Sequence, residues 1–342
     1  MKKILLSSAA IAAFAGAAAA EVTFSGSAQL GYNDTEVEGL YADADLDIKM
    51  SQELDNGWTA SLTYGVELED LNKGVNQDFN ADNNVLFSLT SDSYGIYYGN
   101  TDTAANSLWT GAGDMANDGF SEQDAEEVLK ATANVAGVEA AVSTIIEPAT
   151  NEDAQTSVAA KGTFGNYTVG VAYQEEGDVL SYAAGDQEDY NSDELYGLFA
   201  STSFAGAEVT AAYASNETTG EDSFGLEVAY PVGDVTIGAF YVAESLGDDS
   251  YGVSADYAAG AFAVSAFYED VQGVEDGGVE GSYDLGNGLV VYAGYIDSTE
   301  GYVGAEYDLG GGASIIASYA DQDEEGEKEY DEGTSLILNL KF

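Results

Sequence analysis

The sequence contains no cysteine, no histidine and no arginine, and only two prolines among 342 residues. Without cysteine the chain has no disulfide framework and no thiolate chemistry. The absence of both histidine and cysteine excludes Ser-His-Asp hydrolysis and most zinc sites. Carboxylate pairs of the glycosidase type arise by chance among 62 acidic residues, so they are no catalytic signal here. We therefore expect no enzyme activity and no catalytic residues.

Positive charge is also scarce in this chain. Eight lysines stand against 62 acidic residues, and the formal net charge is −54. A nucleic-acid partner is excluded, because the chain cannot form a basic binding surface. Chains this acidic are often disordered. Here 45% of the residues are hydrophobic and 24 are tyrosines, and their alternating order indicates a folded β protein.

The first 20 residues are typical of an export signal. Lys2 and Lys3 precede an apolar run over 4–16, and small residues follow at 18–20. We expect residues 1–20 to be a signal peptide and residues 21–342 to form the mature domain; a buried N-terminal helix is the alternative. Beyond this segment no apolar run approaches about 18 residues, so the sequence predicts no transmembrane helix.

Apolar and polar residues alternate from the start of the mature domain. Apolar or small side chains take the even positions over 22–32, 42–50 and 58–68, and a turn signal, Asp55-Asn56-Gly57, precedes the third run. Each run has about 9–11 residues or slightly more, the length of a strand that crosses a bilayer at a tilt. The pattern predicts an all-β fold, namely a transmembrane antiparallel up-and-down β-barrel.

Tyrosines recur in two series with spacings of 24 to 28 residues, which corresponds to one hairpin per period. One series ends strands that lead into acidic loops, and the other ends strands that lead into tight turns. Aromatic residues at both strand ends fit the two girdles of a membrane barrel, whereas a soluble sandwich does not need them. The loop-side series is Tyr213, Tyr241, Tyr268, Tyr295 and Tyr319, and the turn-side series is Tyr230, Tyr257, Tyr283 and Tyr307.

Turn signals give an estimate of the strand number. Nine tight turns occur between 55–57 and 310–312, and a strand on each side of every turn brings the count close to 20. Because some signals also fit bends within a longer strand, we expect an even number between 16 and 20. The longer loops are expected at 70–83, 101–126, 147–154, 177–193 and 322–332.

The chain ends with alternating leucines and a final aromatic residue, Phe342. This pattern is typical of a last strand that closes a barrel against the first, because an open edge in lipid would leave backbone groups unpaired.

Four stretches of the sequence resemble the general diffusion porins of alphaproteobacteria. They are 24–32 (FSGSAQLGY), 164–170 (FGNYTVG), 307–315 (YDLGGGASI) and 340–342 (LKF). The resemblance implies a 16-stranded barrel that forms a homotrimer in the outer membrane. It also implies that the third extracellular loop folds into the lumen, where its acidic residues face a basic cluster on the wall. Small hydrophilic solutes and ions would diffuse through such a pore.

The missing arginines set this chain apart from that family pattern. Where arginines are expected on the first two strands, the sequence has Gln29, Asp43 and Asp45. A pore lined by charge of one sign concentrates the opposite ion, so we predict a cation-selective pore. A structural or adhesive outer-membrane barrel with a closed lumen is one alternative, and a secreted acidic β protein is another.

Residues 101–126 form the candidate constriction loop, chiefly because of the resemblance; an ordinary solvated surface loop is the alternative. Glycines at 111, 113 and 119 permit a compact fold. The acids that would line the constriction are Asp102, Asp114, Asp118, Glu122 and Asp124.

Strand alternation independently assigns charges to the pore wall. A basic residue that faces lipid near the bilayer midplane costs about 2–4 kcal/mol, so charges are expected to point inward. The predicted wall residues are Asp43, Asp45, Asp47, Lys49, Glu67, Lys130 and Lys161. The same rule turns inward Glu139, Glu208, Glu227, Asp256, Glu280, Asp284, Glu306, Asp308 and Lys341.

The expected partners follow from the barrel and the resemblance. They are outer-membrane lipid and lipopolysaccharide, further copies of the chain in a homotrimer, and the barrel-assembly machinery acting on Phe342. No cofactor is expected, apart from Ca²⁺ or Mg²⁺ held loosely at acidic loops. The acidic stretch 321–332 lacks the ligand spacing of a dedicated calcium loop, and we expect it to be a solvated surface loop.

Overall fold

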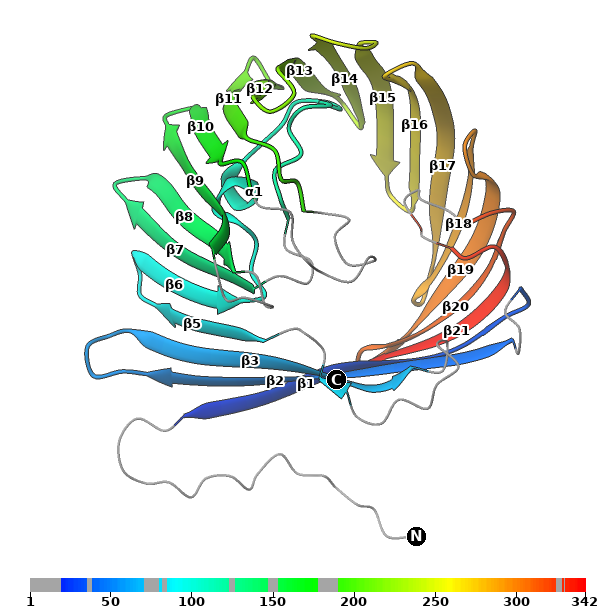
Figure 1. Cartoon of the computed structure of the whole chain (residues 1–342). Helices are drawn as coiled ribbons and strands as arrows, with labels where there is room; N and C mark the ends of the chain where they lie inside the picture. The colour runs from blue at the N-terminus through cyan, green and yellow to red at the C-terminus, as the bar shows by residue number, and fades with distance from the viewer. Residues whose placement is uncertain are drawn as a thin grey trace.

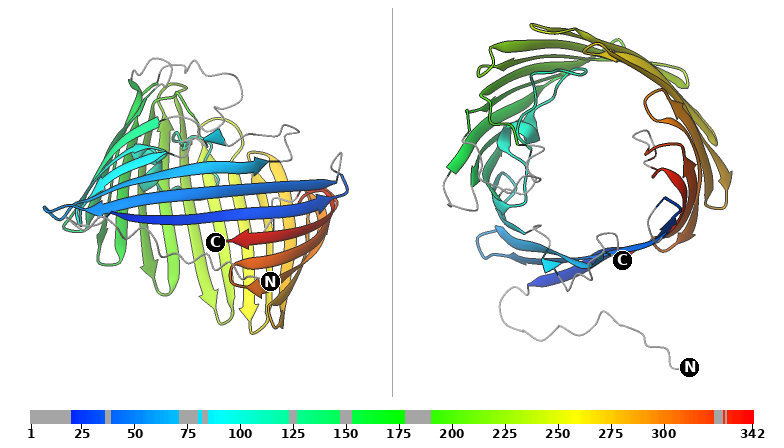
Figure 2. Two further views of the ribbon diagram at one scale, coloured as in Figure 1. Left: turned by 90° about the horizontal axis from the view of Figure 1, so that it is seen from below. Right: turned by 45° about the vertical axis from the view of Figure 1, so that its right-hand side comes forward.

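Antiparallel strands form a closed ring in the computed structural model (Figures 1 and 2). The structure describes residues 20–35, 39–70, 80–81, 85–122, 127–146, 153–177, 190–323, 328 and 330–342. Each strand pairs with its sequence neighbours, except that β3 pairs with both β4 and β5, and β1 also pairs with β21. No helix within these ranges is long and apolar enough to cross a membrane.

The strands follow one another around the ring in chain order. They are β1 (Glu21–Asn33), β2 (Leu40–Glu53), β3 (Thr59–Asp70), β4 (Asn80–Ala81), β5 (Leu86–Thr90), β6 (Tyr94–Gly99), β7 (Glu127–Val135), β8 (Val138–Ile146), β9 (Asp153–Phe164), β10 (Tyr167–Gln174), β11 (Leu195–Phe204), β12 (Ala207–Asn216), β13 (Glu221–Val232), β14 (Val235–Glu244), β15 (Ser250–Ala259), β16 (Phe262–Val271), β17 (Val274–Gly286), β18 (Leu289–Ile296), β19 (Glu300–Gly310), β20 (Ala313–Ala320) and β21 (Gly333–Lys341).

The barrel has twenty strands. The two-residue β4 pairs with β3 on the same side as β5, so it extends β5 and adds no strand to the ring. Each of the nine predicted tight turns joins two full strands, and β1 and β21 complete the count. The direct count of 20 is therefore confirmed, and the number 16 implied by the resemblance is wrong.

The chain termini close the ring as predicted. Leu30 lies opposite Leu338 in the β1–β21 register. The Phe342 N–H donates to the Gly26 carbonyl at 2.9 Å, and the Gly26 N–H donates to the Phe342 carbonyl at 3.3 Å. The last residue thus supplies backbone hydrogen bonds that an open edge would lack, as a barrel in lipid requires.

The two ends of the barrel differ in their connections. One end carries only short turns, such as Asn287–Gly288, whose φ angles of 54° and 83° suit the twist of a β-hairpin. The longer connections, including the one that contains the helix α1 (Ala104–Leu108), all lie at the other end. In outer-membrane barrels the longer loops are extracellular, which orients the chain.

The inward and outward faces alternate without a break around the barrel. Residues directly opposite each other in paired strands point to the same face, so the register carries the assignment from strand to strand. Starting at Ser27 opposite Asp45, it passes through Tyr97 opposite Lys130 and returns to Ser27 opposite Lys341. Every acid and lysine that alternation had assigned to the pore wall lies on the inward face of its strand.

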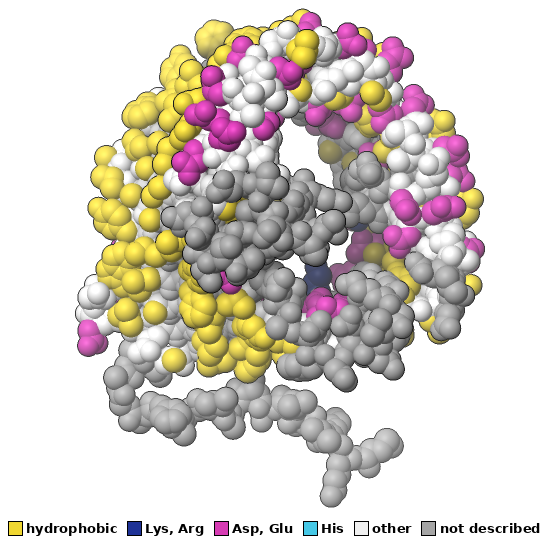
Figure 3. Space-filling view, viewed as in Figure 1, with side chains coloured by type: hydrophobic (Ala, Val, Ile, Leu, Met, Phe, Trp, Pro, Cys, Tyr) yellow, Lys and Arg dark blue, Asp and Glu magenta, His cyan; other side chains and the backbone are white. Residues whose placement is uncertain are grey.

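The outward face is apolar with tyrosines at both ends. Both predicted tyrosine series point outward and are exposed in the single chain, for example Tyr295 at 52% and Tyr283 at 47%. Figure 3 shows the resulting apolar outer wall, with acidic side chains gathered at the loop-side rim.

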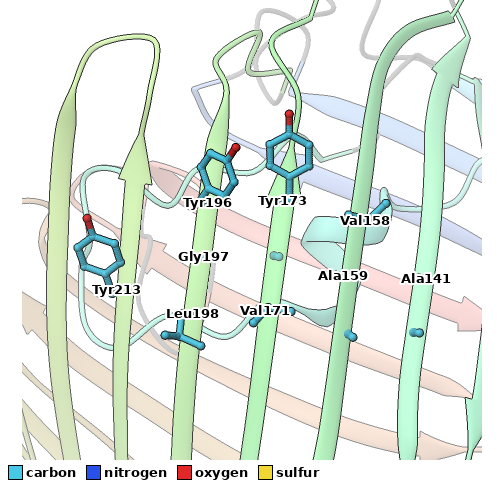
Figure 4. A pocket seen from close by; sticks show the side chains of 12 residues that line it. Ala141, Val158, Ala159, Val171, Tyr173, Tyr196, Gly197, Leu198 and Tyr213 are labelled. Carbon is cyan, nitrogen blue, oxygen red and sulfur yellow. The ribbon is translucent and has the colours of Figure 1, made fainter.

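A groove on the outer wall illustrates this layering (Figure 4). It has a volume of about 650 Å³ and lies over β8 to β12, where small outward residues such as Ala140 and Ala160 leave room beside Val171. Tyr173 and Tyr196 stand at its loop-side end, and both donate hydrogen bonds to the Glu194 carboxylate. From the middle of the barrel toward the loop side, the groove therefore presents apolar residues, then tyrosines, then a carboxylate. This is the order expected where a protein surface passes from lipid to water.

Candidate pore and constriction

The connection between β6 and β7 folds into the barrel. We call its described part, residues 100–122, the inner loop. Its helix α1 packs against the inward faces of β8, β9 and β10, and the remainder runs along the wall toward β14 (Figures 1 and 2). The predicted inward-folded loop is confirmed.

Serine side chains of the wall anchor the start of α1. The backbone N–H groups of Ala104 and Ala105 donate to Ser143 Oγ at 2.7 Å and Ser157 Oγ at 3.1 Å. The first N–H groups of a helix have no partner within the helix. Thr103 caps a third one, because Asn106 N–H donates to Thr103 Oγ1. The wall and the cap together satisfy the backbone of a helix that is only five residues long.

Small inward residues on the wall make room for the inner loop. A Cβ on Gly197 would overlap the Trp109 ring, and a Cβ on Gly225 would overlap the Ala112 carbonyl oxygen. Trp109 also packs against Phe199, with ring centroids 5.8 Å apart. Other small inward residues buried under or beside the loop are Ala141, Ala159, Ala172, Ala212 and Ala214.

Two polar networks fix the far end of the inner loop. Asn117 N–H donates to Ser223 Oγ at 3.1 Å, and Ser223 donates to Glu244 at 2.5 Å. Ser121 N–H donates to Gln174 Oε1 at 2.7 Å. Buried wall side chains therefore hold both ends of the inner loop, Ser143 and Ser157 at its start and Ser223 and Gln174 at its far end.

Acidic side chains gather where the inner loop meets β13 to β16. Gly113 N–H donates to Glu227 and Ala116 N–H donates to Glu244. The Asp114 side chain is exposed to the lumen and close enough to Glu269 to repel it. The loop side and the wall side of this contact therefore carry charge of the same sign.

Asp118 is the most enclosed acid of the inner loop. It accepts a hydrogen bond from Trp109 Nε1 at 3.0 Å. Burial raises the pKa of the Asp118 carboxyl above its ordinary value of 3.8; the Trp109 hydrogen bond opposes this rise, and the nearby charges of Glu244 and Asp114 add to it. Desolvation disfavours the charged form of a carboxyl, and neighbouring negative charges do the same.

The remaining predicted loop acids are placed less centrally. Asp102 and Glu122 are exposed, and Asp102 lies close enough to the inward Lys130 for their charges to interact. Asp124 lies outside the described residues. The structure thus brings Asp114 and Asp118 together with wall acids, but it does not bring Asp102 or Glu122 into the same group.

The predicted wall acids of β2 form a second, separate group. Asp43 and Asp45 line a lumenal cavity of about 600 Å³ together with Glu306, Asp308 and Lys341. Asp47 and Lys49 follow toward the turn end of β2, and Glu67 is opposite Asp45 in the register. On β9, Lys161 Nζ is 4.0 Å from the Glu139 carboxylate.

Several lumenal residues were not predicted from the sequence, among them Glu244, Glu269, Lys328 and Tyr330. Glu244 and Glu269 obey the same alternation as the predicted wall acids, so strand parity could have found them. Lys328 and Tyr330 belong to the stretch 321–332, which we had expected to be solvated. At these two residues that expectation is wrong, because Lys328 Nζ lies 3.3 Å from Glu306 and Tyr330 is buried against Tyr302.

The comparison with known families matches the barrel and its inner loop. A family model described as Gram-negative porin matches residues 7–327. The chain belongs to the Gram-negative porin family. The predicted resemblance to porins is therefore confirmed, and the closed barrel is that of an outer-membrane diffusion pore.

Solved porin structures share the fold at low identity. One mutant of Rhodopseudomonas blastica porin has a TM-score of 0.51 at 19% identity, covering 77% of this chain and 98% of its own. A second mutant of that porin has a TM-score of 0.50 at 18% identity, with the same coverage. A structure titled "Asymmetric conductivity of engineered proteins" has a TM-score of 0.51 at 15% identity, covering 95% of this chain and all of its own. No curated protein sequence matches the chain.

Among the residues that the structure describes, no three acidic side chains form a group that could hold a metal ion.

Proposed function

We propose that this porin conducts cations in preference to anions, through a lumen whose fixed charge is predominantly negative. The proposal rests on one observation: an unbroken alternation around the ring turns at least fourteen strand carboxylates inward. They are Asp43, Asp45, Asp47, Glu67, Glu139, Glu208, Glu227, Glu244, Asp256, Glu269, Glu280, Asp284, Glu306 and Asp308.

Lysines do not offset this charge. Five lysines are described, and three of them have an acid nearby: Lys130 is near Asp102, Lys161 is 4.0 Å from Glu139, and Lys328 is 3.3 Å from Glu306. The other two, Lys49 and Lys341, lie toward the turn end of their strands. Near the inner loop the field is therefore set by Asp114, Asp118 and the carboxylates of β13 to β16. A lumen lined by one sign of charge raises the local concentration of the opposite ion.

The experiment is a planar-bilayer recording of the purified mature protein under a KCl gradient. Ohmic steps and a zero-current potential of the sign that denotes K⁺ preference are expected. A zero-current potential of the opposite sign would contradict cation selectivity. Absence of any ohmic step would instead favour a structural or adhesive barrel with a closed lumen.

We propose further that residues 1–20 are cleaved as a signal peptide, with Glu21 as the first mature residue. The basic, apolar and small-residue segments in that order support this assignment. Mass measurement of the protein isolated from outer membranes checks it, since retention of residues 1–20 would contradict it.

A homotrimer is proposed from the family resemblance. Small outward residues on the first two strands, among them Gly26, Ala42 and Ala44, would permit a flat contact between copies. Native mass spectrometry in mild detergent distinguishes a trimer from a monomer. Contacts with lipopolysaccharide, recognition of Phe342 by the barrel-assembly machinery, and loose binding of Ca²⁺ or Mg²⁺ at the acidic loops stay proposals of the same kind.

A further inference from the structure

A cluster of tyrosines and carboxylates lies on the inner wall over β17 to β19, across the lumen from the inner loop (Figure 1). Tyr292 and Tyr302 project inward from β18 and β19, and Tyr330 packs on them from the last loop. Glu280 accepts a hydrogen bond from Tyr302 Oη at 2.8 Å, and Glu306 completes the group. We call these five residues the tyrosine cage.

Two glycines allow the rings to lie flat on the wall. A Cβ on Gly294 would overlap the Tyr302 ring, and a Cβ on Gly304 would overlap the Tyr330 ring. The rings of Tyr302 and Tyr330 meet edge to face, with centroids 5.5 Å apart. The backbone therefore provides space at the two places where the aromatic walls stand.

An ammonium group occupies this cage. Lys328 Nζ lies 4.3 Å from the centroid of the Tyr292 ring and 3.3 Å from Glu306 Oε2. Burial alone would lower the pKa of Lys328, but Tyr292 and Glu306 raise it above its ordinary value. Burial also raises the pKa of Tyr330 to about 12, so this ring is uncharged at neutral pH.

We propose that the tyrosine cage is a lumenal binding site for alkylammonium ions, and that Lys328 occupies it as a tethered ligand. An aromatic face attracts a cation through its quadrupole, and the attraction is stronger where the pair is partly desolvated. The carboxylate supplies the charge partner, and the ring faces accept the methylene groups of the amine. The cage therefore fits a primary alkylammonium ion, which is what the end of a lysine side chain is.

The tether decides whether a free amine can compete. Because Lys328 belongs to the same chain as the cage, its ammonium group competes as an intramolecular ligand, with an effective concentration on the order of millimolar. Free amine should therefore bind the wild-type chain weakly and bind strongly only when the Lys328 side chain is removed. The inference concerns binding within the lumen and stands apart from the ion selectivity of the pore.

The test is calorimetric titration of the folded protein in detergent with n-butylammonium chloride, which carries the same four carbons and ammonium group as lysine. K328A is expected to bind it at least about tenfold more tightly than the wild type does. K328M keeps the length of the side chain and fills the cage without charge, so it should gain no such binding. K161A removes a lumenal lysine that contacts Glu139 outside the cage, and it should behave like the wild type.

Two further arms make the result specific. Neutral n-butanol should not bind K328A, and K328A combined with Y292L should lose the gain. Equal binding to K328A and K161A would overturn the proposal, as would binding of butanol to K328A. Because calorimetry needs no conduction, failure of this inference is separate from failure of the KCl-gradient experiment, which tests selectivity alone.

Discussion

Two regions of the lumenal wall contact a loop in different ways: one packs against the backbone of the loop, and the other binds its side chains. On β8 to β13 several inward residues are small, and the inner loop lies against them with its own backbone in contact, as at Gly225 and Ala112. On β18 and β19, Gly294 and Gly304 lie under the rings of Tyr302 and Tyr330, and the last loop contributes Tyr330 and Lys328 as side chains. The size of the inward residues, and not alternation alone, therefore indicates where a loop packs against the wall.

The two walls also differ in how they treat charge. Beside the inner loop, wall carboxylates accept backbone N–H groups and stand close to further carboxylates of the loop. In the tyrosine cage a carboxylate instead faces an ammonium group. The first wall should therefore control ion selectivity, whereas the second should control occupancy by a specific cation.

The strongest test of the small-residue wall is G225V. The added side chain cannot fit beside the Ala112 carbonyl, and overpacking of this kind costs about 1–3 kcal/mol. We expect the inner loop to leave the wall and single-channel conductance to rise. G238A is the control, because its Cβ would meet only the movable Ser254 side chain. If G225V kept the conductance of the wild type, as the control G238A should, the inner loop would not pack against Gly225.

A smaller effect is expected from the helix anchors. S143A combined with S157A removes the acceptors for the Ala104 and Ala105 N–H groups, at about 1 kcal/mol for each hydrogen bond. Faster hydrogen exchange at these two amides is the expected result. S265A, on the inward face of β16, serves as the control. Unchanged exchange in the double variant would show that the wall serines do not hold α1.

Neutralising the loop acids should change selectivity with little change in structure. In D114N combined with D118N, the Trp109 hydrogen bond can persist, because asparagine keeps an acceptor oxygen. In water, a fixed charge about 4 Å from a permeating ion changes the energy of that ion by about 1 kcal/mol. The permeability ratio of K⁺ to Cl⁻ should therefore fall about two- to fivefold. D222N removes an acid that faces outward and pairs with Tyr213, and its zero-current potential should match the wild type. An unchanged potential in the double variant would place the constriction elsewhere.

The smallest predicted effect is a pH dependence carried by Asp118. Because its pKa is raised, the folded state holds this proton more tightly than the unfolded state does. Protonated Asp118 therefore contributes to the stability of the folded state. This contribution is fully present below the ordinary pKa of 3.8 and is lost as the pH rises through the raised pKa of the folded state. On acidification, Asp118 should lose its charge before carboxyls of ordinary pKa do. Cation preference should therefore begin to fall at higher pH in the wild type than in D118N, and identical pH profiles would contradict this assignment.

Much of the fold was predictable because alternation is a strong local signal. A lipid-facing charge is costly, so the direction of Asp45 or Lys161 follows from its place in the strand. Turn signals gave the strand number better than the family resemblance did, since each turn is encoded by its own residues. The inner loop was predictable as a loop, but its docking face depends on the sizes of residues such as Gly197 and Ala172, which lie far apart in sequence.

The contacts of the last loop, residues 321–332, with the lumenal wall could not be predicted from the sequence. Acidic residues dominate the stretch 321–332, and composition alone favours a solvated loop. This stretch also contains Lys328 and Tyr330. These two residues could have indicated that part of the loop binds an aromatic and acidic wall. That wall is formed by β17 to β19, and only the register brings Tyr292, Tyr302 and Glu280 together.

If fixed negative charge in the lumen selects cations, the zero-current potential must depend on the salt concentration. With a fixed concentration ratio across the bilayer, the mean KCl concentration is lowered from about 1 M to about 0.01 M, which lengthens the Debye length from about 3 Å to about 30 Å. The zero-current potential should indicate stronger cation preference as the salt is diluted. A potential that stays near zero at both concentrations, or that turns toward anion preference in dilute salt, would contradict it.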